Sequence, residues 1–249
     1  MFELMFNPSL LAGMVTAEHF ERVLAFWQQY GQGMAYTVML SFCTVLFGSL
    51  FGLLLALMRM SKVWVLKGFA AVYAEVIRCT PMLVQLYIVF YGLFAVASPF
   101  YKLLPHTSVG FVDLDRFIPG IVALTMNSAA YLSETFRAGI QGIDYGQTEA
   151  ARSLGMSSWQ TMKMVVLPQA VKNMLPAIAN EFVTIIKESS ICSVLGMSEI
   201  MYFTKIVQGS TFIAFEPLLV AAALYFTLTF PTSKVIAYFE RRMRRGDVR

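Results

Sequence analysis

A group of polar side chains lies between residues 180 and 188, inside a segment that is otherwise apolar. At 100° per residue these side chains share one face of a helix, within about 120° of arc. The members of this polar stripe are Asn180, Glu181, Thr184, Lys187 and Glu188. A charged side chain that faces lipid costs at least about 2.5 kcal/mol. The stripe therefore belongs in the interior of a helix bundle or beside a water-filled cavity.

Two interpretations of the polar stripe are open. Glu181 and Glu188 lie on the same face, seven residues apart, and would attract an α-amino group or a basic side chain of a substrate. Alternatively, Lys187 pairs with one of the carboxylates in an internal ion-pair network. If the stripe binds a substrate, polar residues of two other segments are candidates to line the same path: Asn127, Arg78 and Gln85.

The elements that must position these residues are membrane-spanning helices. Hydrophobic residues make up 57% of the 249 positions, charged residues only 14%, and the mean hydropathy is +0.64. A helix needs about 20 mainly apolar residues to cross a bilayer. Five segments are of this kind: 33–58, 68–97, 119–140, 175–195 and 212–237. Pro81 is expected to kink the second of them. We therefore expect an all-α integral membrane protein with about five transmembrane helices.

The lysine and arginine residues predict the orientation of these spans, because basic residues are concentrated on the cytoplasmic side. In a five-span arrangement, one side carries Arg22, Lys102, Arg116 and Lys205. The other side carries Arg59, Lys62, Lys67, Arg152, Lys163, Lys172 and the arginines of the C-terminal tail. The N-terminus is therefore expected outside and the C-terminus inside. The basic tail is explained by orientation in the membrane, without a nucleic-acid partner.

The chain divides into three parts by composition. Residues 1–31 are expected to form an amphipathic lead-in, because Phe20, Leu24 and Trp27 follow helical spacing. Residues 32–239 form the transmembrane domain, and residues 240–249 form a basic cytoplasmic tail.

The loop at residues 141–172, predicted to be cytoplasmic, has a pattern of its own. Glu149 to Leu154 favours a helix, which Gly155 should stop. Ser157 or Ser158 can cap a second helix, which is expected to end before Pro168. This element either packs against lipid or docks to another protein.

The same loop carries a recognisable motif. Glu149, Ala150 and Ala151, followed by Gly155 and then by Val165, Leu167 and Pro168, resemble the EAA motif of ATP-binding-cassette importer permeases. That family has Ile where Val165 stands, which keeps a β-branched apolar side chain. The similarity extends over roughly residues 33–239, through SETFRAGI, GQTEAARSLGMS, LPQAVKNMLP and NEFVTIIKESSI, and resembles the polar amino acid branch of the family.

This resemblance implies a function and a set of partners. The chain would be the permease subunit of a binding-protein-dependent importer in a bacterial inner membrane, taking up polar amino acids, with basic ones among the candidates. It would work with a second permease subunit, ATPase subunits and an extracytoplasmic amino-acid-binding protein. The loop would dock in a cleft of the ATPase as a coupling helix, through Glu149, Ala150, Ala151, Arg152, Gly155, Leu167 and Pro168. Glu149 is expected near the N-terminus of that helix, where a carboxylate is stabilised.

The sequence assigns ATP to the partner. No G-x-x-x-x-G-K-[ST] motif occurs in the chain, so ATP and Mg²⁺ are expected on the ATPase subunit and no cofactor on this chain. A secondary transporter or channel that uses Glu181, Lys187 and Glu188 as an ion relay is the alternative, but the sequence has no internal repeat. An intramembrane enzyme has no support, because no catalytic motif such as H-E-x-x-H is present.

Overall fold

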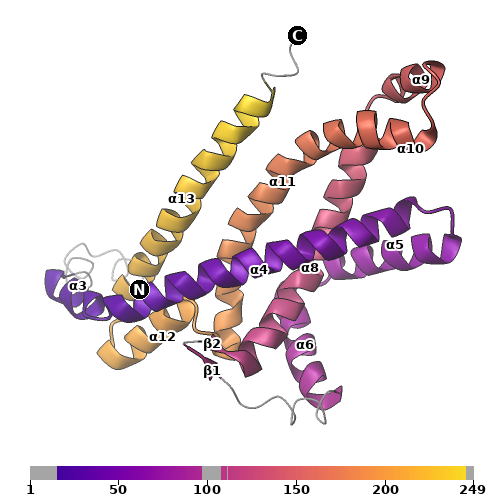
Figure 1. Ribbon diagram of the computed structural model, residues 1–249. Helices are drawn as coiled ribbons and strands as arrows, with labels where there is room; N and C mark the ends of the chain where they lie inside the picture. Colours follow the sequence, from indigo (N-terminus) through magenta and orange to yellow (C-terminus); the bar gives the residue numbers. More distant parts are fainter. Residues whose placement is uncertain (1–15, 97–107, 111, 245–249) are drawn as a thin grey trace, which may run out of the picture.

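The computed structural model describes residues 16–96, 108–110 and 112–244, and most of them are helical. This confirms the expected all-α class (Figure 1). The α-helices are α3 (Ala17–Leu24), α4 (Trp27–Met60), α5 (Trp64–Cys79), α6 (Met82–Val96), α8 (Leu114–Gln141), α9 (Tyr145–Ser153), α10 (Ser158–Thr161), α11 (Leu167–Glu188), α12 (Ile200–Thr211) and α13 (Glu216–Arg244). A π-helical turn covers Met162–Val166, a 3-10 helix covers Ser189–Leu195, and strands β1 (Ser108–Val109) and β2 (Val112–Asp113) pair antiparallel.

The helix α8 lies at the centre of the fold and packs closely against α4. Gly52 of α4 allows this approach, because a Cβ atom there would lie 2.9 Å from the Cβ of Leu132. Small residues have this role in membrane proteins, where helices associate by close packing rather than by the hydrophobic effect. Twelve residues of α8 are buried, including Asn127 and Ser128, so polar groups on this helix face protein.

The second apolar segment is broken at Pro81, where α5 ends and α6 begins at an angle of 112°. Pro81 has no N–H to donate to the preceding turn, which explains the end of α5 at Cys79. The expected kink is thus confirmed as a sharp break. A second break, of 49°, separates the Ser158–Leu195 stretch from α12.

Two helices of the described residues are long and apolar enough to cross a membrane singly, namely α4 and α13. Each of the two bent pairs would add one span. The helix α8 falls outside this set because polar residues are spaced along it, which its enclosed position tolerates. Figure 1 shows α9, α10 and the C-terminal end of α13 at the same end of the molecule, as the five-span topology requires. The number of spans and their orientation stay predictions.

The expected lead-in and tail are partly helical. The helix α3 lies within the predicted lead-in, and α4 begins there too, at Trp27. Val23 of α3 is buried in a cluster with Ile213, and His19 Nδ1 lies 2.6 Å from Glu216 Oε1 at the start of α13. At the other end, α13 continues to Arg244. Residues 1–15 and 245–249 lie outside the described residues.

Candidate functional site

The helix α9 of the predicted coupling loop is fixed at both ends. Asp144 is its N-cap, and its side chain accepts a hydrogen bond of 2.7 Å from the N–H of Gly146. At the other end, the N–H of Met156 donates to the carbonyl of Ala151, and the N–H of Gly155 donates to that of Arg152. This is a Schellman motif. Gly155 takes the left-handed conformation that the motif needs, with φ of +85°, which confirms the predicted stop.

Two details of this loop differ from the sequence prediction. The helix α9 begins at Tyr145, so Glu149 lies inside it rather than near its N-terminus, because Asp144 provides an earlier cap. The second helix was expected to end before Pro168, and this was wrong. Ser157 caps α10 in a capping box with Gln160, and the helix then passes through the π-helical turn into α11. Pro168 lies in the first turn of α11.

The residues predicted to contact an ATPase do not all face outward. Glu149 and Ala150 are exposed, as are Arg152, Leu167 and Pro168, whereas Ala151 is buried within the chain. Three large apolar side chains of the same element are strongly exposed: Tyr145 (73%), Leu154 (84%) and Trp159 (71%). Sequence reasoning missed these three residues. Their apolar character in a segment predicted to lie in the cytoplasm was the signal available.

The polar stripe of α11 contacts α8 through Glu181. The hydroxyl of Ser128, which is fully buried, donates a hydrogen bond of 2.8 Å to Glu181 Oε1. Ile185 and Ile186 are buried beside it. Glu181 and Glu188 are half-buried, whereas Asn180 and Lys187 are exposed, and Thr184 donates to the carbonyl of Asn180 at 3.2 Å. The stripe therefore presents one protein-bound carboxylate beside exposed polar groups.

The structure does not support the ion-pair interpretation of the stripe. Within the described residues, Lys187 forms no ion pair with Glu181 or Glu188. The role of the two carboxylates in substrate binding stays a prediction.

Gln85 and Asn127 lie together, at the break between α5 and α6. The Nδ2 of Asn127 donates to Gln85 Oε1 at 3.0 Å, and Gln85 Nε2 donates to the carbonyls of Ile77 (2.6 Å) and Thr80 (2.9 Å). Both side chains are buried. These contacts hold the end of α5 and α6 against α8. Their predicted role in a substrate path stays a prediction.

Arg78 belongs to a cluster around Glu134. The Glu134 carboxylate pairs with Arg59 of α4, with Arg137 at 2.7 Å and with Arg78 at 3.6 Å. The guanidinium of Arg78 also lies 5.7 Å from the centre of the Tyr131 ring. Three cations therefore share one carboxylate, which joins α4, α5 and α8. The pair between Glu134 and Arg137 is an i,i+3 contact within α8.

In the described part of the chain, no three His, Cys, Asp or Glu side chains are grouped so that they could hold a metal ion. What the arrangement offers is non-covalent: a half-buried carboxylate on a helix that continues into an exposed apolar element.

Comparison with known proteins is consistent with these features. The family model of the binding-protein-dependent transport system inner membrane component matches residues 48–245. The arginine transport system permease protein ArtQ of Bacillus subtilis is 37% identical over 216 residues, which cover 87% of this chain and 93% of that protein.

Two solved structures share the fold. A crystal structure of an amino acid ABC transporter with histidines has a chain that is 40% identical, with a TM-score of 0.80 over 92% of this chain and 100% of that one. An inward-facing structure of the MetNI methionine ABC transporter, at 19% identity, covers 88% of this chain and 98% of its own with a TM-score of 0.66, and supports the fold alone. The chain therefore belongs to the family of inner membrane components of binding-protein-dependent transport systems.

Proposed function

We propose that this chain is the permease subunit of an importer that takes up polar amino acids, driven by ATP hydrolysis in a separate subunit. ATP and Mg²⁺ bind to that ATPase, and this chain binds no cofactor. A second permease subunit, of the same or a similar sequence, completes the path through a bacterial inner membrane. An extracytoplasmic binding protein delivers the amino acid.

The observation that carries this proposal is the exposed apolar surface of α9 and α10. Tyr145 begins α9 and Leu154 is its C-cap, whereas Trp159 lies on α10, which Ser157 caps. Exposed apolar side chains on a rigid element indicate a protein interface. Glu149 and Arg152 of α9 are charged, and these charges favour a contact with protein over a contact with the lipid interface.

The connection to α11 explains how such a contact would move the substrate site. From Ser158 to Glu188 the chain is helical without interruption, through α10, the π-helical turn and α11. A displacement of Trp159 by the ATPase therefore tilts the helix that carries Glu181. Because Glu181 bonds to Ser128, the motion also reaches α8. We infer that this motion opens the substrate site to one side of the membrane and then to the other, which is alternating access.

The chemistry of the polar stripe supports an amino acid as the substrate. Glu181 and Glu188 lie on one face of α11, and neither pairs with a cation within the described residues. A carboxylate forms strong, charge-assisted hydrogen bonds with ammonium and guanidinium groups. The similarity to an arginine transport system permease agrees with such a substrate.

The test is transport by the complex reconstituted with its ATPase and binding protein. Trp159→Ser should abolish substrate-stimulated ATP hydrolysis and uptake, while membrane insertion and yield stay unchanged. Trp27→Ser is the matched control, because Trp27 is also strongly exposed but lies at the start of α4, outside the loop. Wild-type uptake by the Trp159 variant would refute the docking surface.

The predicted topology has a separate test. A cysteine at Ser108 should react with an impermeant reagent from outside, and one at Ser157 only from inside. Both residues are exposed. The reverse pattern would overturn the orientation.

A further inference from the structure

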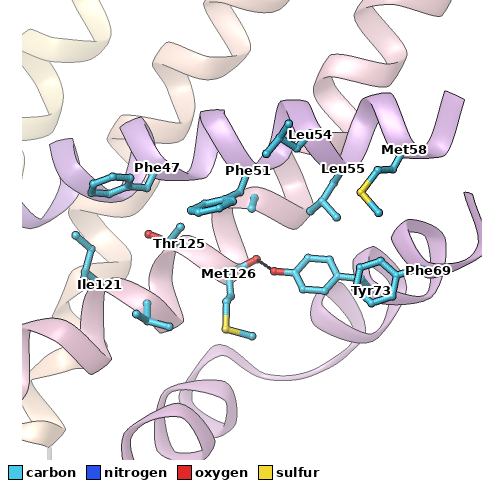
Figure 2. Close-up of a pocket in the computed structure, with 12 residues that line it drawn as sticks. Phe47, Phe51, Leu54, Leu55, Met58, Phe69, Tyr73, Ile121, Thr125 and Met126 are labelled. Carbon is cyan, nitrogen blue, oxygen red and sulfur yellow. Dashed lines mark hydrogen bonds between the residues drawn. The ribbon is translucent and has the colours of Figure 1, made fainter. Parts of the chain in front are cut away.

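A groove lies between α4, α5 and α8, away from the polar stripe, and has a volume of about 560 Å³. Figure 2 shows its walls: Phe47, Phe51 and Leu54 from α4, Phe69 and Tyr73 from α5, and Ile121 and Met126 among those from α8. Its volume is within the range of ligand sites, roughly 300–1,000 Å³. Nothing in the proposed transport mechanism uses it.

The walls of the groove offer almost no polar partner. Thr125 contributes the one aliphatic hydroxyl among the lining side chains, and the hydroxyl of Tyr73 already donates to the carbonyl of Met126 at 3.0 Å. A polar or charged ligand would therefore lose its hydration without compensation. The groove suits a hydrocarbon chain.

The charge at one end of the groove is positive. Met58 lines the groove where α4 ends, and the segment from the last turn of α4 to the first turn of α5 carries Arg59, Lys62 and Lys67. No acidic residue occurs between positions 59 and 74. Arg59 pairs with Glu134, whereas Lys62 and Lys67 are exposed and, within the described residues, form no ion pair.

The same segment carries a residue typical of the membrane surface. Trp64 is 81% exposed, and tryptophan is enriched where lipid headgroups meet the hydrocarbon. Lys62 and Lys67 are among the lysines predicted to face the cytoplasm, and the cytoplasmic leaflet is the anionic one. The end of the groove is therefore suited to a negatively charged headgroup.

We infer that this groove is a binding site for an anionic phospholipid. One acyl chain lies between α4, α5 and α8, and the phosphate is held by Lys62 and Lys67. A helix of a second copy fits less well, because helix contacts in membranes use small residues. The α4–α8 contact has such a residue in Gly52, whereas the groove exposes Phe47, Phe51 and Leu54.

The experiment compares lipid retention by the assembled transporter in nanodiscs of phosphatidylcholine with and without phosphatidylglycerol. Native mass spectrometry counts the lipids that remain bound to this chain. Wild-type protein should retain phosphatidylglycerol in preference to phosphatidylcholine. In the double variant Lys62→Gln, Lys67→Gln, the ratio of retained phosphatidylglycerol to phosphatidylcholine should fall about fivefold for each lysine removed. Lys234→Gln removes an exposed cation of α13 and should leave the preference unchanged.

A second pair of variants tests the acyl chain. Phe51→Ser places a hydroxyl in the groove and should reduce retention of both lipids. Leu50→Ser is the control, because Leu50 is an exposed neighbour on α4 that does not line the groove. Equal retention of both lipids by wild-type protein would overturn the proposal. So would a disulfide between two copies of Phe51→Cys, which would place a second permease in the groove.

Discussion

Ser128 of α8 donates a hydrogen bond to Glu181 of α11, with 2.8 Å between Oγ and Oε1. This contact orients the carboxylate that we assign to the substrate. If Glu181 binds a cationic group, Glu181→Gln removes a charge-assisted hydrogen bond worth about 1.5–3 kcal/mol, and substrate affinity should fall about ten- to a hundredfold. Thermal stability should change little, because the glutamine oxygen still accepts from Ser128. Uptake and thermal unfolding of the same preparation measure the two effects.

The matched test of the orienting contact uses two buried serines of α8. Ser128→Ala should weaken substrate binding, whereas Ser133→Ala should not, because Ser133 bonds to the carbonyl of Ala130 in its own helix. A loss of stability with unchanged affinity in the Glu181 variant would show that the carboxylate has a structural role only.

The left-handed conformation of Gly155 should be needed for coupling. With φ of +85°, an alanine there costs about 1–2 kcal/mol, and the end of α9 should loosen. Gly155→Ala should therefore reduce ATP-dependent uptake without preventing insertion. Gly209→Ala is the control, because an added Cβ at either position meets no atom within 4 Å and Gly209 has an ordinary helical conformation. Equal uptake by the two variants would contradict this reading.

Gln85 and Asn127 should depend on each other for stability. Gln85→Leu removes the acceptor of the buried Asn127 amide, and a buried group left without its partner costs about 1–3 kcal/mol. In a double-mutant cycle with Asn127→Leu, the coupling energy should lie within about 0.5–3 kcal/mol. Thermal unfolding of the four proteins gives this value, and strict additivity would rule out the contact.

Glu134 should matter more than any one of its arginine partners. Glu134→Gln leaves Arg59, Arg78 and Arg137 without their shared carboxylate. The loss of folding free energy in this variant should lie between about 1 kcal/mol, the value for an exposed ion pair, and about 3–5 kcal/mol, the value for a buried one. Arg137→Gln should cost less, because two arginines still pair with Glu134. Glu18→Gln, which breaks the exposed pair with Arg22, is the control and should have almost no effect on thermal stability.

Local sequence signals predicted several features of the fold correctly. The break at Pro81, the stop at Gly155 and the cap at Ser157 each depend on the backbone chemistry of a few neighbouring residues. The same reasoning failed at Pro168, because the π-helical turn before it lets the helix continue. The proline rule assumes an α-helix on both sides, which this segment does not have.

Contacts between distant segments could not be predicted in this way. The polar stripe was recognised from its spacing, but its bond to Ser128 joins residues 53 positions apart. Gln85 and Asn127 were both selected as polar residues in apolar segments, yet their packing at the helix break follows from how α6 meets α8. Periodicity identifies the face of a helix that is polar, and the packing of neighbouring helices decides which groups meet there.

The contact between His19 and Glu216 bears on how the chain is made. The two residues are 197 positions apart, so α3 leaves the ribosome long before its partner at the start of α13. Synthesis adds about 5–20 residues per second, which separates the two events by roughly 10–40 s. During that interval the buried face of α3, with Val23, has no final packing partner from α13. Assembly of this end of the molecule must therefore wait for the last helix.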